Sequence, residues 1–528
     1  MSVLAIDAGT TGVTALIVAA DGSVTSRGYS EFSQYFPEPG WVEQAPAGIW
    51  DATLAACAAA LAARANADPV TCVGITNQRE TAVLWDRSTL IAPHRAIVWQ
   101  DRRTARICAE LRDTGHEDRV AELTGLRLDP YFTATKLTWL ARHAPSVWAD
   151  VRGGNVAVGT VDSYLIARLT GGRRHVTDAS NASRTLLFDI NTGQWSEELC
   201  GLFGVPMSAL PEVVPSSGVI ASTDPEAFLG LSVPIAGVAG DQQAALFGQA
   251  CYWPGSSKCT YGTGSFLLTN TGSRLVRSNA GLLTTVAWMD TSGALTYALE
   301  GAIFVTGAAI QWLRDGLGVI HSASDSEELA RSVDDSSGVV FVPALTGLGA
   351  PDWDPEARGA IFGLTRGVTK AHLARATLEA IAFEVRDVVD VMASEAGAEP
   401  GAGAEPAPGA EPAAGAEPGA GAGPGAGGAP LRVDGGASAN DLLMQIQADQ
   451  LQMPVERPVV AETTGLGAAF LAGLAAGVWS GPEELAATWQ LDRRFDPGRR
   501  DDSAHRRWRE AVRRSLRWAG EDAGTPQD

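Results

Sequence analysis

The sequence predicts an α/β protein built from strand-and-helix domains, and three observations lead to this prediction. Its 528 residues exceed what one compact core holds, so the length alone indicates two large domains or about three smaller ones. Apolar runs of strand length alternate with longer helical patterns along most of the chain. A hairpin with a Gly/Thr turn opens the chain at residues 3–19, and a similar hairpin recurs at 258–269. This recurrence, a weak internal repeat, favours two domains, over residues 1–250 and 251–528.

Bulk composition excludes several classes of function. The formal net charge of −21 argues against a nucleic-acid-binding protein and against a protein held on anionic lipid by charge. We expect no stable membrane insertion, because no uninterrupted apolar run is long enough to span a bilayer. The six cysteines show no metal-ligand or redox spacing, so we expect free thiols in a reducing compartment. These features, together with an N-terminus that lacks a basic leader, predict a cytoplasmic protein.

The turn of the first hairpin has the chemistry of a phosphate site. Gly9 and Gly12 remove side chains where phosphate oxygens could approach, and Thr10 and Thr11 offer hydroxyl and amide donors. Asp7, at the end of the preceding strand, could orient a hydrated magnesium ion. A plain hairpin with a polar turn explains this segment equally well.

Charged residues follow the next predicted strand. We expect a helix at 46–65 and an apolar strand at 70–76, which delivers Arg79 and Glu80 at its carboxyl end. Ligand groups of α/β sheets lie at such ends. An adjacent Arg and Glu usually form a solvated surface pair, but this pair comes directly off a buried strand. Arg79 could donate to a hydroxyl while Glu80 accepts from one, which suits a polyol.

Asp241 is the candidate catalytic base. It follows an apolar strand at 234–240 on a turn flanked by glycine, where we expect substrate to approach the backbone. A carboxylate there can take the proton from a hydroxyl as its oxygen attacks phosphorus. Asp and Gly are also the ordinary residues of surface turns, so the assignment depends on the other site residues.

The second half repeats the pattern and ends in helices. The hairpin at 258–269 has a Gly-Thr-Gly turn, so the two hairpins could grip a triphosphate from opposite sides. A strand at 431–434 leads through a glycine turn into a helix at 441–450, where an adenine ring or ribose could lie against backbone. A plain strand-to-helix turn fits equally well. Further helices are expected at 306–314, 370–392 and 505–518, the last amphipathic and docked on the body.

Residues 394–430 consist almost wholly of Ala, Gly, Glu and Pro. Such a composition buries too little apolar surface to offset the ordering entropy, so we expect a disordered loop. The run 423–428 matches a dinucleotide-binding fingerprint, but neither a strand nor a helix flanks it, so the match is compositional chance.

The motifs resemble those of the FGGY carbohydrate kinases of the actin-like superfamily, most closely the members that phosphorylate glycerol, whereas a P-loop motif is missing. The resemblance covers nearly the whole chain apart from 394–430. It implies two actin-like (ribonuclease H-like) domains with mixed sheets and an interdomain cleft. The matching motifs are PGWVE at 39–43, GITNQRET at 74–81, TDASNASR at 177–184, GDQQAALFG at 240–248 and RGAIFGLTR at 358–366.

The resemblance also implies substrates and site residues. Glycerol and ATP are the implied substrates, with Mg²⁺ held by Asp7 and Asp241, and Asp241 as the base. The implied glycerol-binding residues are Arg79, Glu80, Trp99, Tyr131, Asp241, Gln242 and Phe266. The implied nucleotide-binding residues are Thr10, Thr11, Gly12, Thr263, Gly307, Gln311, Gly436 and Asn440. Without the resemblance, Trp99 and Tyr131 would be read as core aromatics.

Two departures from the family pattern stand out. Thr14 replaces an arginine that many family members place near the nucleotide, which bears on nucleotide affinity rather than on reaction type. Residues 221–230 lack the glycine-rich basic loop through which some members bind a sugar bisphosphate inhibitor, so we expect no such inhibition. The family resemblance implies a homo-oligomer, a dimer or a tetramer.

Three alternatives stay open at this point. One is an FGGY kinase for a longer polyol or sugar, which the aromatic residues Trp99, Tyr131 and Phe266 disfavour because bulky walls reject larger ligands. Another is an actin-like ATPase without a small acceptor, which would need no polyol pocket. The third is a silent binding protein, although every expected catalytic residue is present.

Overall fold

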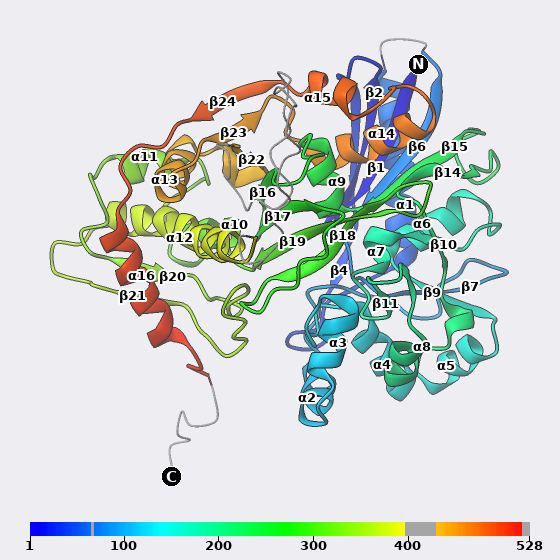
Figure 1. Cartoon of the computed structure of the whole chain (residues 1–528), viewed down its shortest axis with the longest axis horizontal. Helices are drawn as coiled ribbons and strands as arrows, with labels where there is room; N and C mark the ends of the chain where they lie inside the picture. Colours follow the sequence, from blue (N-terminus) through cyan, green and yellow to red (C-terminus); the bar gives the residue numbers. More distant parts are fainter. Residues whose placement is uncertain (65–67, 397–428, 520–528) are drawn as a thin grey trace, which may run out of the picture.

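The computed structural model describes residues 1–64, 68–396 and 429–519. In these residues the chain forms two large β-sheets surrounded by helices (Figure 1). The first sheet has the strand order β14-β15-β6-β1-β2-β3 and the second β18-β19-β17-β16-β22-β23-β24. Both contain parallel and antiparallel neighbours, as mixed sheets do. The predicted α/β class is therefore confirmed, while the domain boundary at residue 250 stays a prediction.

Three parallel strands of the first sheet end at the same edge. β1 (Ser2–Ala8) and β2 (Gly12–Ala19) form the predicted antiparallel hairpin. β6 (Val70–Asn77) runs parallel to β1, and β15 (Pro234–Gly240) runs parallel to β6. Because parallel strands finish on the same side, the residues that follow β1, β6 and β15 are brought together. The site described below lies at this edge.

The second sheet repeats this arrangement. β16 (Ser257–Tyr261) and β17 (Ser265–Gly272) form the second predicted hairpin, and β22 (Leu431–Asp434) lies parallel to β16 as β6 does to β1. β19 (Leu295–Ile303) pairs with β17 and extends the sheet on the other side. The internal repeat seen in the sequence is thus a repeat of strand topology.

Helix α1 (Pro46–Ala63) forms where a helix was predicted at 46–65. It is 18 residues long and apolar enough, by length and composition alone, to cross a membrane. In the fold it packs against β2 and β3 (Val24–Glu31), and Ile49 and Trp50 are buried in the core of the first sheet. Its apolar character is accounted for by this packing.

Helices α9 (Asp241–Gly248) and α14 (Thr463–Ala475) pack closely on the first sheet, although α14 comes from the second half of the sequence. Figure 1 shows α14 beside β1 and β6. A Cβ atom added to Gly467 would lie 1.8 Å from the Ala244 carbonyl oxygen, and one on Gly248 would lie 2.0 Å from that of Thr463. Only glycine permits this approach.

The other predicted helices form with small changes in their bounds. α10 (Gly307–Gln311) continues into a π-helical turn, η2 (Trp312–Gly316), where a regular helix was expected. α12 (Lys370–Ala396) is longer than predicted, so the first residues of the supposed loop at 394–430 are helical. Residues 397–428, the rest of that prediction, lie outside the described residues. α13 (Asp441–Leu451) and α16 (Asp502–Ser515) form as expected.

α16 is docked on the body, as predicted, because Trp508 and Val512 are buried against residues such as Phe383. The remaining elements are β4 (Gln34–Tyr35), β5 (Glu43–Gln44), β7 (Val83–Asp86), β8 (Ala96–Ile97), α2 (Ala105–Asp113), α3 (Glu117–Thr124), α4 (Thr133–His143), α5 (Pro145–Arg152), β9 (Val156–Gly159), α6 (Val161–Leu169), β10 (Val176–Asp178), α7 (Ala179–Ala182), β11 (Phe188–Asp189), β12 (Gln194–Trp195), α8 (Glu197–Phe203), η1 (Met207–Ala209), β13 (Glu212–Val214), β14 (Ser217–Ser222), β18 (Leu283–Met289), α11 (Asp325–Arg331), β20 (Val340–Val342), β21 (Ala360–Phe362), η4 (Gly436–Ala439), β23 (Val455–Pro458), α15 (Pro482–Thr488) and β24 (Leu491–Phe495).

Candidate active site

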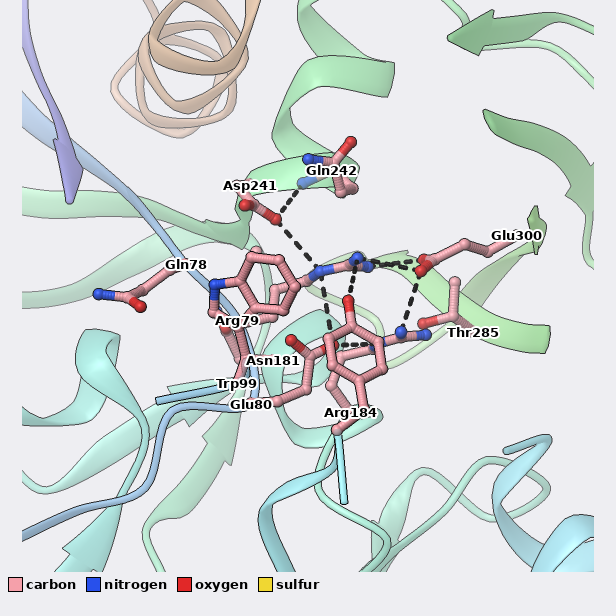
Figure 2. Close-up of polar contacts among 12 residues, drawn as sticks. Gln78, Arg79, Glu80, Trp99, Asn181, Arg184, Asp241, Gln242, Thr285 and Glu300 are labelled. Atoms are coloured by element: carbon pink, nitrogen blue, oxygen red, sulfur yellow. Dashed lines mark hydrogen bonds and ion pairs between the residues drawn. The ribbon is translucent and has the colours of Figure 1, made fainter. Parts of the chain in front are cut away.

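Arg79 is the centre of a buried polar cluster at the edge where β6 ends (Figure 2). Its two terminal nitrogens bind the Glu300 carboxylate at 2.6 and 3.0 Å, a bidentate pair. Its Nη2 lies 3.3 Å from the Tyr131 hydroxyl, and its Nε lies 3.1 Å from an Asp241 oxygen. The structure therefore brings together three sequence-predicted residues, Arg79, Tyr131 and Asp241.

Glu80 belongs to the same cluster through a second arginine. Arg184 donates to Glu80 Oε1 at 2.7 Å and to Glu300 Oε1 at 2.9 Å. Glu80 has a positive φ of 58°, a strained conformation for a non-glycine residue that recurs at functional sites. Burial raises the pKa of Glu80, although Arg79 and Arg184 act in the opposite direction.

Glu300 and Arg184 are site residues that sequence reasoning missed. Burial alone would raise the pKa of Glu300, but Arg184 and Arg79 outweigh it and lower that pKa to about 2. Glu300 therefore stays ionised and binds the two arginines of the first half to β19 of the second sheet. The one sequence signal was a single carboxylate within the apolar run 298–302.

Asp241 opens α9 rather than lying in a free turn, which corrects the sequence-based picture. Its Oδ1 accepts a hydrogen bond from the Gln242 backbone N–H at 2.7 Å, and 29% of its side chain is exposed. Burial raises the pKa of Asp241, opposed by Arg79 and by Lys258. A partly accessible carboxylate with a raised pKa is suited to accept a proton.

Lys258 on β16 is a further residue that the sequence analysis passed over. Its side chain is fully buried, and its Nζ donates to Gln242 Oε1 at 2.5 Å and to Thr260 Oγ1 at 2.8 Å. Burial lowers the pKa of Lys258. Gln242, predicted to bind substrate, is thus tied to the second sheet.

Three aromatic rings gather beside the charged cluster. The ring centroids of Trp99 and Tyr131 are 5.7 Å apart, and those of Trp99 and Phe266 are 6.3 Å apart. Lys136 fixes the segment that carries Tyr131 by donating to the Tyr131 carbonyl at 2.6 Å and to the carbonyls of Pro130 and Phe132. The three predicted aromatic residues therefore form one aromatic wall. Trp99 and Tyr131 come from the first half of the chain, and Phe266 comes from the second.

The first hairpin turn adjoins this wall. Trp99 Nε1 donates to Thr10 Oγ1 at 2.9 Å. Thr11 is exposed, while Thr10 is half-buried and Gly12 begins β2. Thr14, at the position where many family members carry an arginine, pairs across the hairpin with Asp7.

Asp7 lies in a site of concentrated negative charge. Burial, Asp241 and Glu462 raise its pKa to about 7. A divalent cation would relieve this repulsion, and Mg²⁺ is commonly held by one or two carboxylates together with substrate phosphates and water. Among the described residues, no group of three or more potential metal ligands gathers. By their charge, the carboxylates of Asp7 and Asp241 fit a magnesium ion carried with a polyphosphate.

The second hairpin turn contacts the start of α10. Thr306 and Ala308 donate their backbone N–H groups to the Thr263 carbonyl at 2.9 and 3.1 Å, and Gly307 donates to that of Gly262 at 3.0 Å. A Cβ atom on Gly307 would lie 2.6 Å from the Gly262 carbonyl oxygen, so the contact requires glycine. Gln311, at the end of α10, is exposed. The predicted residues Thr263 and Gly307 are thus adjacent.

The remaining two predicted nucleotide residues follow β22. Gly436 is exposed, with open space around its Cα. Asn440 caps α13 by accepting from the Leu443 N–H at 2.9 Å, and it donates to Ser326 Oγ at 3.3 Å. Neither residue hydrogen-bonds to the Arg79 cluster within the part of the chain that the structure describes. They belong to a separate region of the second half.

Comparison with known proteins agrees with this geometry. Residues 2–248 match the N-terminal domain of the FGGY family of carbohydrate kinases and residues 257–476 match its C-terminal domain. The chain is 54% identical over 520 residues to a glycerol kinase of Aromatoleum aromaticum, spanning 98% of this chain and 99% of that one. It is 49% identical to a glycerol kinase of Thermus thermophilus, spanning 97% and 98% of the two chains.

Solved structures agree as well. The crystal structure of Plasmodium falciparum glycerol kinase with ADP has a TM-score of 0.84 and 33% identity, covering 98% of both chains. A xylulose kinase from Lactobacillus acidophilus has a TM-score of 0.81 at 21% identity, covering 97% of this chain and 96% of that one, which reflects the shared fold.

Fold and site together define a small-molecule kinase, in which two related α/β halves meet at a cluster of acidic, basic and aromatic side chains. The chain belongs to the FGGY family of carbohydrate kinases. The family resemblance and the actin-like fold class inferred from the sequence are therefore confirmed.

Proposed function

We propose that the protein transfers the γ-phosphoryl group of ATP to a terminal hydroxyl of glycerol, giving sn-glycerol 3-phosphate. The observation that carries this proposal is the joining of Arg79, Glu80 and Asp241 with an aromatic wall directly beside the first hairpin turn. The same substrate is supported by glycerol kinases whose sequences are 54% and 49% identical to this chain over nearly its full length.

The charged side chains select and orient the acceptor. Arg79 donates to one glycerol hydroxyl and Glu80 accepts from another, with the Tyr131 hydroxyl beside them. Trp99 and Phe266 cover the carbon chain and restrict its length, because a longer sugar would collide with the rings.

Asp241 acts as the base. Its carboxylate takes the proton of the terminal hydroxyl as that oxygen attacks phosphorus, and its raised pKa favours this transfer. Arg79, 3.1 Å away through its Nε, keeps the carboxylate oriented toward the acceptor. Closure of the two halves excludes water, which would otherwise compete as the acceptor.

The two hairpin turns hold the nucleotide from opposite sides. Thr10, Thr11 and Gly12 bind phosphates from the first half, and Thr263 and Gly307 bind them from the second. Gln311, Gly436 and Asn440 form the nucleoside end of this site. Asp7 and Asp241 would hold Mg²⁺, which would supply charge neutralisation at the phosphates.

A panel of acceptors tests the proposal. Purified protein is incubated with magnesium-ATP and glycerol, dihydroxyacetone, xylulose or gluconate, and ADP formation is followed. We expect glycerol to give the highest kcat/KM. Faster turnover with xylulose or gluconate would show that the aromatic wall has been assigned to the wrong substrate. ADP formation at the same rate without any acceptor would instead indicate an ATPase.

We further propose that the protein acts in the cytoplasm as a homo-oligomer with domains divided near residue 250. All six cysteines are buried free thiols, in agreement with a reducing compartment. Sedimentation equilibrium distinguishes a dimer or tetramer from a monomer.

A further inference from the structure

The backbone carbonyls of Ala8, Gly9 and Thr10, which lead into the turn of the first hairpin and through it, all accept hydrogen bonds. The Ala8 carbonyl accepts from the Gln78 backbone N–H at 2.8 Å, and the Gly9 carbonyl accepts from the Gln78 side-chain amide at 3.2 Å. The Thr10 carbonyl accepts from two side-chain amides, those of Gln34 at 3.0 Å and Gln44 at 2.8 Å. Three glutamines thus hold two successive peptide groups.

Holding a carbonyl also orients the neighbouring amide. In a planar trans peptide, the carbonyl of one residue and the N–H of the next point in opposite directions. The N–H groups of Thr10 and Thr11 must therefore point away from the glutamines. Within residues 1–64, 68–396 and 429–519, no group accepts a hydrogen bond from either N–H. Successive N–H groups aimed at one space form an anion-binding turn.

The three glutamines are themselves fixed by one another. Gln34 and Gln44 are paired residues on the neighbouring strands β4 and β5, and Gln44 is fully buried. Gln78 is 1% exposed and donates a second hydrogen bond to Gln44 Oε1 at 2.8 Å. The Thr81 hydroxyl donates to Gln78 Oε1 at 3.0 Å, so both polar atoms of the Gln78 side chain have hydrogen-bond partners.

This network also reaches the polyol wall. The Trp99 backbone N–H donates to Thr81 Oγ1 at 3.3 Å, and the Trp99 indole donates to the Thr10 hydroxyl at 2.9 Å. With its oxygen occupied as an acceptor, the Thr10 hydroxyl has its own proton available for a ligand oxygen. Trp99 therefore supports the turn directly through Thr10, and indirectly through Thr81 and Gln78.

We propose that Gln34, Gln44 and Gln78 are positioning residues for the nucleotide polyphosphate, acting through the turn carbonyls to aim the N–H groups of Thr10 and Thr11 at phosphate oxygens. This inference rests on the proposed function, because it assigns the turn to the nucleotide. The glutamines touch no substrate themselves. Their neutral amides bind the carbonyls without adding charge beside Asp7.

Methionine variants test the inference because methionine approximates the length of glutamine and lacks the amide. The variants are Gln34→Met, Gln44→Met and the double variant, which removes both donors to the Thr10 carbonyl. Gln447→Met is the matched control, since Gln447 is also fully buried and donates to a backbone carbonyl, that of Ala382. The half-buried position of Gln34 makes its variant the least disruptive to folding.

Two readouts are compared, steady-state kinetics and calorimetric binding of magnesium-ADP without glycerol. We expect each single variant to raise the KM for ATP and the Kd for ADP about threefold, and the double variant to raise both about tenfold or more. The KM for glycerol and the thermal midpoint should stay close to those of the Gln447→Met control.

Normal ADP binding by the double variant, or a parallel rise in the KM for glycerol, would overturn the inference. The proposed function fails separately, if the wild-type protein does not phosphorylate glycerol. In that event, weaker ADP binding by the variants would still support the glutamine assignment, whereas unchanged binding would contradict it.

Discussion

At the scale of single residues, the fold determines the position and the pKa of Asp241, the proposed base. It opens α9 directly after β15, and its partners are a backbone N–H and the Nε of Arg79. The N-terminus of a helix favours a negative charge, while burial favours the neutral form. The result is a carboxylate whose pKa is raised and whose orientation is fixed before substrate binds.

Replacing Asp241 with asparagine tests this assignment. We expect kcat to fall about 10³-fold, because asparagine keeps the shape and the hydrogen-bond acceptor but cannot take the proton. The Kd for glycerol should change by less than about threefold, since Arg79 and Glu80 are untouched. Calorimetry and single-turnover kinetics measure the two effects, with the exposed Asp21→Asn as control. An active Asp241→Asn enzyme would eliminate the proposed base.

A second residue-scale prediction concerns stability against pH. His175 Nε2 lies 2.9 Å from the Val158 carbonyl, to which it donates, so its Nδ1 accepts from Arg87 at 3.1 Å. Burial, and then the charge of Arg87, lower the pKa of His175 from 6.5 to about 4. Between these values the unfolded chain binds a proton that the folded chain does not, so stability falls as pH drops below about 6.5.

The expected contribution of His175 at pH 5 is a loss of about 2 kcal/mol relative to pH 7. Urea denaturation at pH 5 and pH 7 measures this contribution. The shift of the midpoint between the two pH values should be larger for the wild type than for His175→Gln. The variant His94→Gln, at a half-buried position, should retain the wild-type shift. Identical pH dependence in wild type and His175→Gln would show that His175 titrates normally in the folded protein.

At the scale of elements, the contact between α9 and α14 sets the position of Asp241, the proposed base. The two helices approach so closely at Gly467 that any side chain there meets the backbone of α9 at Ala244. α14 comes from the second half of the sequence but packs on β6 and β15 of the first sheet. A shift of α9 would therefore move Asp241 relative to Arg79.

Gly467→Ala should lower the free energy of unfolding by about 1–3 kcal/mol through overpacking, and should reduce kcat more than the KM for ATP. Gly201→Ala, in the middle of α8 with open space around it, is the matched substitution and should stabilise by about 0.5–1 kcal/mol. Chemical denaturation and steady-state kinetics provide both numbers. Full activity and stability in Gly467→Ala would disprove the close contact.

Most elements could be predicted from the sequence because their signals are local. The hairpin turns carry Gly and Thr between apolar runs, and α16 shows its buried face through Trp508 and Val512. The π-helical turn after α10 had no such local signal.

The residues of the candidate site also differ in whether a local sequence signal predicts them. Arg79 and Glu80 were found because they follow a predicted strand, and the family motifs supplied the rest. Glu300 and Arg184 were missed because their roles arise from pairings with Arg79 and Glu80 across 221 and 104 positions of sequence, which local patterns do not report. Lys258 sits in a predicted strand and is informative only once its buried amine is seen beside Gln242.

At the scale of the whole molecule, the two halves meet through the site itself. Glu300 of the second sheet binds both arginines of the first half, and Lys258 of the second sheet binds Gln242 at the start of α9. The pairs of Glu300 with Arg79 and Arg184 are buried, hydrogen-bonded charge pairs, which are costly to break singly. The proposed acceptor pocket therefore depends on residues of both halves.

The most direct measurement is ³¹P NMR of wild-type protein with magnesium-ATP and glycerol. We predict a phosphomonoester resonance of glycerol phosphorylated at a terminal carbon, growing in step with ADP and lost when Asp241→Asn replaces the wild type. Release of inorganic phosphate in step with ADP, without a glycerol phosphate signal, would contradict the account and identify an ATPase instead.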